Sequence, residues 1–287
     1  MKIATLESFR RQAFKTRELI LESATEGGCF LGSAFSCVDV ILYLYSKFLR
    51  VSPEKVADPF RDYFFLSKGH AVAALYGVLS VTGFFKEDVL RGPESDPRVY
   101  WHPNPNLPGV EHQSGSLGQL LSVAVGVALD IQRTRADNRV VVLLGDGELD
   151  EGSIWESLLI ASACKLTNLL IIVDRNGMQA NFETESLIPL EPLLDKFAAF
   201  GCAVKQLDGH DFQQIENSLK SFPLSSSGPS VFVAKTIRGK GIPSIENNWE
   251  QWFVQLPVSR KKELLQELRQ SYFTTQKQVD ELSRYNS

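Results

Sequence analysis

The sequence has little of what marks several large classes of protein. Its 287 residues include only four cysteines, and none of them shows CxxC spacing. A chain of this size needs no disulfide bonds, so the cysteines are predicted to be reduced and mostly buried. The net charge of −4 comes without a block of like charges. This pattern argues against nucleic acid or a membrane surface as the main partner.

Long hydrophobic runs are also missing. The longest apolar runs, residues 140–144 and 169–173, are far too short to cross a bilayer. The first 25 residues mix charged and apolar side chains and lack the uninterrupted apolar core of a signal peptide. There is no internal repeat or low-complexity segment. The sequence therefore predicts a cytoplasmic protein without a membrane partner, with 44% apolar residues to fill a core.

The two apolar runs have the features of buried parallel strands. Each is rich in Val, Ile and Leu, and each ends in a polar turn that contains glycine, GDGELDEGS after the first and DRNGMQ after the second. Between them, residues 153–165 carry apolar side chains at helical spacing, with Ser153 as the expected N-cap and Glu156 three residues later. Together these segments predict a βαβ unit.

Similar alternation continues along the chain. YFFLSKGH leads into a helix expected from Ala71, FGCAVKQLDGH precedes a helix expected near Phe212, and SVFVAKTI follows the loop LSSSGP. The predicted fold is α/β, with a doubly wound, mainly parallel sheet flanked by helices. We expect one domain over residues 1–257. Residues 258–287 are charged and helix-prone, and form either a solvated end helix or an arm that grips a partner.

The turns after the two strands predict a site for a metal ion and a phosphate group. In open parallel sheets, ligands bind beyond the carboxyl ends of the strands, where both turns must lie. Asp146 offers a carboxylate oxygen, Asn176 an amide oxygen and Met178 a carbonyl oxygen. These ligands suit Mg²⁺ or Ca²⁺ completed by phosphate oxygens and water. Gly147 and the start of the following helix would let a phosphate come close to backbone N–H groups.

A lone GDG is more often an ordinary turn, but the pair of turns is more specific. The run from GDG through a helix to a strand ending in Asn176 resembles the thiamine diphosphate signature of transketolases. Further segments are similar to the amino-terminal part of transketolase in the same order: LSKGHA (66–71), WHP (101–103), SGSLGQ (114–119), KTIRGKGI (235–242) and ENN (246–248). The chain resembles the diphosphate-binding part of that family, which implies the thiamine diphosphate-binding fold.

The resemblance implies a role for each matching residue. Asp146, Asn176 and Met178 would hold the metal, and His70 and His102 would point at the reacting carbon. The residues that would bind thiamine diphosphate are Gly115, Ser116 and Leu117 under the aminopyrimidine ring, and Gly145, Asp146, Gly147, Glu148 and Asn176 around the diphosphate. Glu151 resembles the glutamate that communicates with a second glutamate in the pyrimidine-binding half. His112 and His210 match no such role.

That second glutamate is absent from this chain, and a full transketolase is more than twice as long. The resemblance therefore implies a separate, C-terminal transketolase-like subunit that binds the pyrimidine, with the cofactor between two chains of a heterotetramer. The expected activity is that of a transferase moving a two-carbon ketol or acyl fragment from a ketose or 2-oxo acid, active only with the partner subunit. Mg²⁺ or Ca²⁺ would hold the diphosphate.

The chain departs from the family at three positions. Phe30 and Phe253 stand where the family has active-site histidines, and Leu120 stands where it prefers glycine, so that a bulky side chain is expected near the cofactor. Losing two polar partners disfavours ordinary pentose phosphates. We expect an unusual acceptor, either less polar or a carrier-bound thiol.

Two other functions remain open. The chain could belong to a component resembling the first enzyme of 2-oxo acid dehydrogenase complexes, which passes an acyl unit to a lipoyl or carrier-protein thiol. It could also be a noncatalytic homologue that only binds the partner or the cofactor. Formation of an acyl thioester would indicate the first, and cofactor binding without turnover the second.

Overall fold

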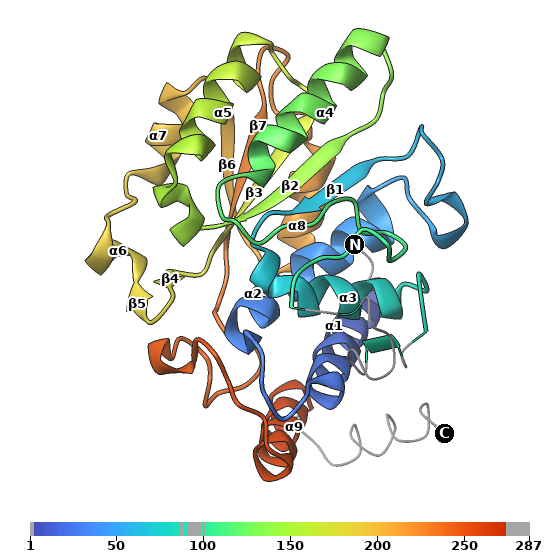
Figure 1. Cartoon of the computed structure of the whole chain (residues 1–287), viewed down its shortest axis with the longest axis vertical. Helices are drawn as coiled ribbons and strands as arrows, with labels where there is room; N and C mark the ends of the chain where they lie inside the picture. The colour runs from blue at the N-terminus through green and yellow to red at the C-terminus, as the bar shows by residue number, and fades with distance from the viewer. Residues whose placement is uncertain (1–2, 87–88, 91–98, 100, 274–287) are drawn as a thin grey trace.

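The chain folds around a five-stranded parallel sheet with the strand order β1-β2-β3-β7-β6 (Figure 1). The computed structural model describes residues 3–86, 89–90, 99 and 101–273. The strands of the main sheet are β1 (Tyr63–Leu66), β2 (Val140–Gly145), β3 (Leu169–Arg175), β6 (Ala203–Asp208) and β7 (Ser230–Lys235). The α/β class and the parallel sheet predicted from the sequence are confirmed.

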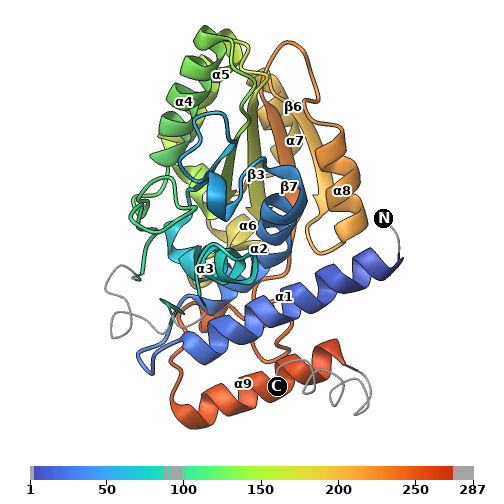
Figure 2. The same ribbon diagram turned by 90° about the vertical axis from the view of Figure 1, so that its right-hand side faces the viewer.

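Helices cover both faces of the sheet. One face packs on α4 (Leu120–Thr134), α5 (Gly152–Ala163) and α7 (Leu193–Ala199), and the other on α1 (Ile3–Ser23), α2 (Leu31–Tyr43), α3 (Val72–Val81) and α8 (Phe212–Lys220). Figure 2 shows α4 and α5 on one side of the strands and α8 on the other. The alternation of side chains along a strand produces these two layers, since Val140 and Val142 face α4 while Val141 and Leu143 face the opposite core.

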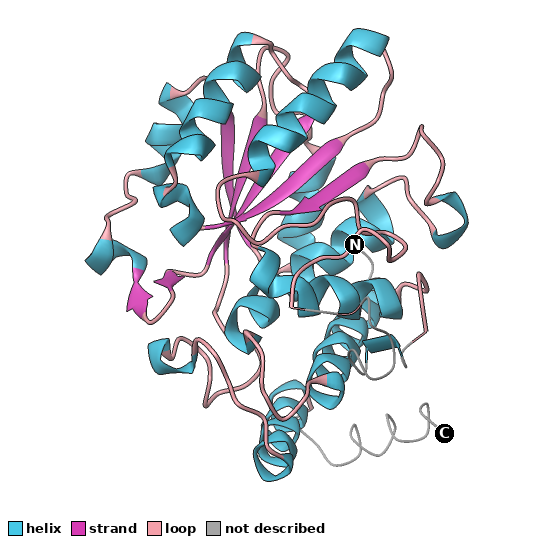
Figure 3. Ribbon diagram, in the orientation of Figure 1, coloured by secondary structure: helices cyan, strands magenta, loops and turns pink. Residues whose placement is uncertain are grey.

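Smaller elements complete the chain. A two-stranded antiparallel hairpin, β4 (Met178–Gln179) with β5 (Phe182–Glu183), lies outside the main sheet and leads into α6 (Thr184–Leu187) (Figure 3). Shorter helical turns are found at Leu44–Phe48, Pro53–Lys55, Gly69–Ala71, Gly147–Asp150 and Trp249–Gln251. Of the helices described, none combines the length and the apolar character that crossing a membrane requires.

One local prediction needs correction. Ser153 is not an N-cap, because α5 begins at Gly152 with Glu151 in the cap position, and the Ser153 hydroxyl instead donates to the Gly118 carbonyl at 2.9 Å. Leu120, which stands where the family prefers glycine, packs in the core. It is the first residue of α4 and is 4% exposed within the core between α4 and the sheet. Its side chain therefore serves packing.

The carboxyl-terminal helix α9 (Val258–Tyr272) lies alongside α1, as Figure 2 shows. Leu264 and Leu268 are fully buried, so this helix contributes to the core rather than standing in solvent. A buried guanidinium ties the helices together: Arg17 donates to the Asp39 carboxylate of α2 and to the Tyr272 hydroxyl, each at 2.8 Å. The rest of the predicted extension, residues 274–287, lies outside the described residues.

His210, which matched no role in the predicted site, links α2 to the loop after β7. Its Nδ1 lies 2.6 Å from the Asp39 carboxylate, and its Nε2 accepts from the Ile237 amide at 2.8 Å. Next to it, the Asp211 side chain caps α8 by accepting from the amides of Gln213 and Gln214. The segment before α8 is therefore fixed by side chains.

Candidate active site at the carboxyl edge of the sheet

Asp146 lies at the end of β2 and is 1% exposed. One carboxylate oxygen accepts from the Gly147 amide at 2.9 Å, and the other accepts from the Gly177 amide at 2.6 Å. The Arg175 guanidinium lies 3.3 Å from the second oxygen. Burial, and next the negative charge of Asp174, raise the pKa of Asp146 to about 6. A buried carboxylate of this kind is stabilised by additional positive charge.

Asp174, which the sequence did not single out, organises the edge beside Asp146. Its carboxylate forms a buried ion pair with Lys68 and accepts from the hydroxyls of Ser36 and Thr236. Burial alone would raise the pKa of Asp174, but the charge of Lys68 and the hydrogen bonds from Lys68, Thr236 and Ser36 together lower it. The sequence signal was an acidic residue inside an apolar strand, since a charge placed there requires a buried partner.

Asn176 is oriented by Asp174. The Asn176 amide nitrogen donates to the Asp174 carboxylate at 2.9 Å, which leaves the amide oxygen to accept from the Met178 amide at 3.0 Å. The structure thus brings Asp146, Asn176 and Met178 to the ends of neighbouring strands. Among the described residues, no group of three or more His, Cys, Asp or Glu side chains could hold a metal. A cation here would use one carboxylate, amide and carbonyl oxygens and oxygens supplied from outside, which is the donor set of a hard ion.

Gly147 must be a glycine at this point of the chain. A Cβ atom at this position would lie 2.7 Å from the Gln179 side chain, so the backbone and β4 could not pack as they do. The Oε1 atom of Gln179 is buried and has no hydrogen-bond partner among the residues that the structure describes. The turn therefore combines a close backbone approach with an open polar atom.

Glu148 links three loops at the edge. Its carboxylate accepts from the Ser67 hydroxyl after β1, from the Gly118 amide at 2.9 Å and from the Gly145 amide at 3.0 Å. Burial raises the pKa of Glu148. Because protein donors occupy both carboxylate oxygens, Glu148 holds these segments together at the edge of the sheet.

Arg238 is the second important residue that the sequence did not single out. Its side chain is 1% exposed and passes beneath Gly32, where a Cβ atom would lie 2.9 Å from Nε. Nη1 donates to the Ala180 carbonyl at 2.7 Å, whereas Nε and Nη2 find no hydrogen-bond partner in the described part of the chain. Burial lowers the pKa of Arg238 to about 10, so the guanidinium stays charged at neutral pH. The open nitrogens of Arg238 could donate to an anion, and the neighbouring carboxylates of Asp146 and Asp174 favour an anion that carries a bound cation.

His70 and His102 lie close enough for their charges to interact. The His70 Nε2 atom is 3.2 Å from the Ser33 hydroxyl, and the backbone carbonyl of His102 accepts from the Tyr76 hydroxyl at 3.2 Å. Burial, followed by the charges of Lys68 and Arg238, lowers the pKa of His70 to about 3. His70 is therefore neutral at physiological pH and can exchange hydrogen bonds without carrying charge.

The loop that contains Gly115, Ser116 and Leu117 is fixed at both ends. The Ser114 hydroxyl donates to the Leu66 carbonyl at 2.7 Å, and the Gly118 amide donates to Glu148. Gly118 has a φ of +81°, and a Cβ atom there would lie 2.6 Å from the Glu151 side chain. Glu151 thus lies beside this loop and is exposed, rather than joining the Asp146 cluster.

One known protein family matches almost the whole chain. The family model described as transketolase, thiamine diphosphate binding domain, matches residues 15–272. The chain belongs to this family.

Individual members of the transketolase family support the assignment. The chain is 34% identical over 265 residues to an apulose-4-phosphate transketolase subunit from Phocaeicola vulgatus, covering 92% of this chain and 93% of that protein. It is 35% identical over 242 residues to the 6-deoxy-6-sulfo-D-fructose transketolase subunit SqwG of a Clostridium species, covering 81% and 86%. Identity to human transketolase is 32% over 269 residues, but these cover only 42% of the human protein.

Solved transketolase structures show the same fold. The structure from Leishmania mexicana superposes with a TM-score of 0.84 at 23% identity, over 92% of this chain and 41% of that one. The structure from Campylobacter jejuni gives a TM-score of 0.80 at 27% identity, over 92% and 43%. The predicted family and the thiamine diphosphate-binding fold are confirmed. The individual roles assigned to the site residues remain predictions.

The two phenylalanines that depart from the transketolase pattern lie together. The rings of Phe30 and Phe253 are 5.1 Å apart, and Trp101 stacks on Phe253 at 5.4 Å with an interplanar angle of 13°. Phe30 also contacts Trp252 at 5.0 Å and His70 at 5.5 Å. We call Phe30, Trp101, Trp252 and Phe253 the aromatic cluster. Phe30 of this cluster contacts His70. At positions 30 and 253 the chain thus has phenyl rings in place of the imidazole rings of the transketolase pattern.

Proposed function

We propose that this chain is the diphosphate-binding subunit of a thiamine diphosphate-dependent transferase of the transketolase type, which acts with a separate pyrimidine-binding subunit. The observation that carries the proposal is the buried polar edge around Asp146 and Arg238, where acids and open guanidinium donors lie together. A metal-bound diphosphate satisfies both charges, because the cation faces the acid and the phosphate oxygens face the guanidinium.

The residues present fit thiamine diphosphate and Mg²⁺ or Ca²⁺. In the proposed complex, Asp146, Asn176 and the Met178 carbonyl hold the cation, and Arg238 donates to the diphosphate through the two nitrogens that are open. When bound, the cofactor supplies a nucleophilic carbon that attacks the substrate carbonyl and carries a two-carbon fragment. Lys68 is engaged with Asp174, so its contribution is to fix Asn176.

His70 and His102 would serve the hydroxyl and carbonyl oxygens of the substrate. A neutral His70 offers one N–H donor and one acceptor, which is suited to holding a hydroxyl and passing its proton. Glu151 is exposed beside the loop at residues 114–118, where it can face a partner chain. These positions support the proposed roles of all three residues.

A partner chain is supported by two further observations. Relatives that match over nearly their whole length are named as transketolase subunits. In addition, Phe182, Leu187 and Ile188, which follow the site through β5 and α6, are 57%, 47% and 51% exposed. Large apolar side chains grouped in one exposed segment are typical of a protein interface. We propose a heterotetramer of two such chains and two pyrimidine-binding subunits.

Calorimetric titration tests the proposal. Thiamine diphosphate with Mg²⁺ is titrated into the chain alone and into its mixture with the pyrimidine-binding subunit, and the measurement is repeated with Asp146→Ala. We expect tight binding only in the mixture and a loss of that binding in the variant. Asp130→Ala removes an exposed carboxylate from α4 and serves as the matched control. Absence of heat in every sample would contradict the cofactor assignment.

A further inference from the structure

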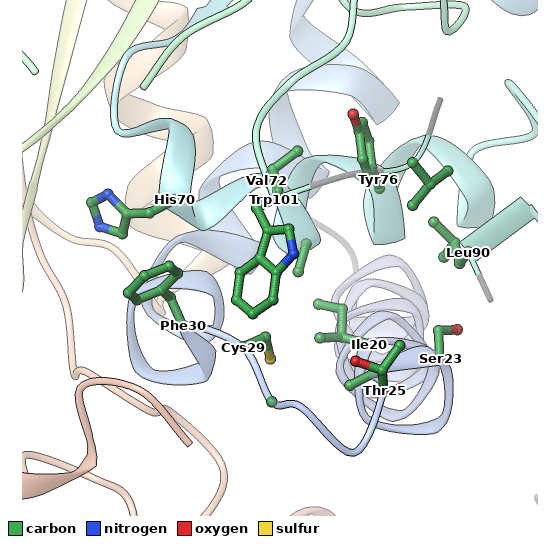
Figure 4. A pocket seen from close by; sticks show the side chains of 14 residues that line it. Ile20, Ser23, Thr25, Cys29, Phe30, His70, Val72, Tyr76, Leu90 and Trp101 are labelled. Carbon is green, nitrogen blue, oxygen red and sulfur yellow. The ribbon is translucent and has the colours of Figure 1, made fainter. Parts of the chain in front are cut away.

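A cavity of about 130 Å³ adjoins the candidate active site on the side away from the polar edge. It lies between the end of α1, the segment before α2 and the start of α3. Trp101, one of the lining residues, appears in the middle of Figure 4, with Phe30 and His70 to one side and Ile20, Ser23 and Leu90 to the other. His70 and Phe30 line the cavity and contact each other, so the cavity adjoins the candidate site at these two side chains.

The described lining of the cavity is mostly apolar, and its polar members are the hydroxyls of Ser23, Thr25 and Tyr76 and the His70 ring. The side chains that dominate it are Ile20, Ala24, Val72, Ala73, Leu90 and Trp101. None of the described residues that line it is an aspartate, glutamate, lysine or arginine, and the Tyr76 hydroxyl on its rim is bonded to the His102 carbonyl and the Asn104 amide. A hydroxyl-bearing chain placed here would exchange its water for carbon surfaces and lose hydrogen bonds.

Two members of the aromatic cluster, Phe30 and Trp101, line this cavity. The rings of the cluster contact one another, with Phe30 and Trp101 at 6.3 Å and Trp101 and Phe253 stacked at 5.4 Å. Apolar cavities of about 150 Å³ stay dry and bind a group as large as benzene. The cavity here therefore has room for about six carbon atoms.

We propose that the cavity binds an apolar substituent of up to about six carbons on the substrate carbonyl, so that the preferred acceptor is an aliphatic or aromatic aldehyde. This inference rests on the proposed function, and it names the substrate class. The substituent is the part of the substrate that is not transferred. It is therefore shared by the acceptor aldehyde and by the ketol that forms from it.

The reaction is balanced with a 2-oxo acid donor such as hydroxypyruvate. The bond between its carbonyl and carboxylate carbons breaks and carbon dioxide leaves. A new bond then joins the former carbonyl carbon to the aldehyde carbon, and the aldehyde oxygen takes up one proton to become a hydroxyl. No external oxidant or reductant is needed.

The test compares aldehydes of increasing length with the complex of this chain, its pyrimidine-binding partner, thiamine diphosphate and Mg²⁺. Acetaldehyde, butanal, hexanal, benzaldehyde and ribose 5-phosphate are used as acceptors with hydroxypyruvate. We expect kcat/KM to rise by up to about fourfold per added methylene through hexanal. Ribose 5-phosphate should be the poorest acceptor. A flat series together with rapid use of ribose 5-phosphate would overturn the inference while leaving the proposed function intact.

Ala73→Leu fills the cavity from α3 and should lower kcat/KM for hexanal at least about tenfold, since a group of several methylenes is displaced. Activity with acetaldehyde should change less than about twofold, because only one methyl must fit beside the site. Ala163→Leu makes the same change on the exposed end of α5 and should alter neither rate. Equal losses with both aldehydes in Ala73→Leu would contradict the assignment. Ala24→Leu fills the cavity from α1 if the first variant does not fold.

A binding measurement decides the inference even if the complex shows no turnover. Benzyl alcohol is titrated into the chain and into the complex, with the methyl groups of Ile20, Ala24 and Ala73 observed by NMR. We expect saturable shifts of these methyl groups in both samples and their loss in Ala73→Leu. Shifts in the chain alone that vanish in the complex would show that the partner covers the cavity, and would overturn the proposal. Absence of shifts in both samples would also overturn it, whereas binding without turnover would count against the proposed function alone.

Discussion

Two regions of opposite character meet at His70. On one side lies the polar edge, where Lys68, Asp146, Asp174 and Arg238 are all about 1% exposed. On the other side lies the aromatic cluster, whose members contact one another mainly through ring faces and edges. Within the described part of the chain, the polar edge has buried donors without partners, and the apolar side has a cavity without charged lining. The difference agrees with the proposal that one site accepts a charged group and an apolar group at neighbouring positions.

The largest effect is expected from breaking the ion pair on the polar edge. Asp174→Ala leaves the Lys68 ammonium buried without its partner and should lower the unfolding free energy by about 3–5 kcal/mol. Urea denaturation followed by circular dichroism measures this loss. The double variant Lys68→Met with Asp174→Leu removes both charges and should recover most of the stability. No recovery would indicate that the bonds to Ser36 and Thr236 matter more than the ion pair.

The next effect separates binding from stability. Arg238→Met removes a buried charge with two open nitrogens, so the chain without ligand should unfold at an equal or higher denaturant concentration. Affinity for thiamine diphosphate should fall about 10- to 100-fold, since charge-assisted hydrogen bonds are lost. Calorimetry of the two-subunit complex gives the affinity. Arg238→Lys keeps the charge and should lose less, and equal affinity in all three proteins would remove Arg238 from the site.

The third prediction concerns how the free energy of unfolding depends on pH through His70, which lies between the polar edge and the aromatic cluster. The pKa of His70 is about 3 in the folded chain and near 6.5 when exposed, so between these values the unfolded chain binds the additional proton. The unfolding free energy should therefore fall as the pH is lowered through this window. The charged and titratable groups that act on the His70 ring are those of Lys68, Arg238, Asp174 and His102. All four are kept in His70→Gln, which therefore serves as the reference for wild type.

Subtracting the two stability curves isolates the His70 contribution. From pH 6.5 to pH 5, wild type should lose up to about 2 kcal/mol more than His70→Gln. Guanidinium denaturation at each pH provides the curves. Parallel curves would mean that water reaches the ring in the folded state and that its pKa is close to the ordinary value.

The smallest effect concerns the aromatic side. Trp101 and Phe253 are stacked, and a double-mutant cycle of Trp101→Ala with Phe253→Ala should give a coupling free energy of about 0.5–1.5 kcal/mol. Phe30→Leu with Asp130→Ala, on α4 at the opposite face of the sheet, is the control cycle and should show no coupling. A coupling near zero for the stacked pair would mean that the two rings move independently.

Residue patterns were sufficient for much of the fold. The runs at residues 140–144 and 169–173 became β2 and β3 because a parallel strand buried on both faces requires an unbroken apolar run. The turns after them had to meet at one edge, so Asp146 and Asn176 could be placed together before any contact was known. The start of α5 was wrongly assigned, because Ser153 bonds to a distant loop rather than to its own helix.

Local residue patterns were enough to predict the α/β class, the parallel strands and the polar turns at their carboxyl ends. These properties follow from periodicity and turn chemistry, which involve residues close together in the chain. Comparison of motifs also showed that Phe30 and Phe253 depart from the family pattern. Three other features emerged only from the folded chain: the open donors of Arg238, the pairing of Asp174 with Lys68, and the cavity between α1 and α3. Such features depend on which side chains from distant segments fill or leave a given space, and no local pattern records that.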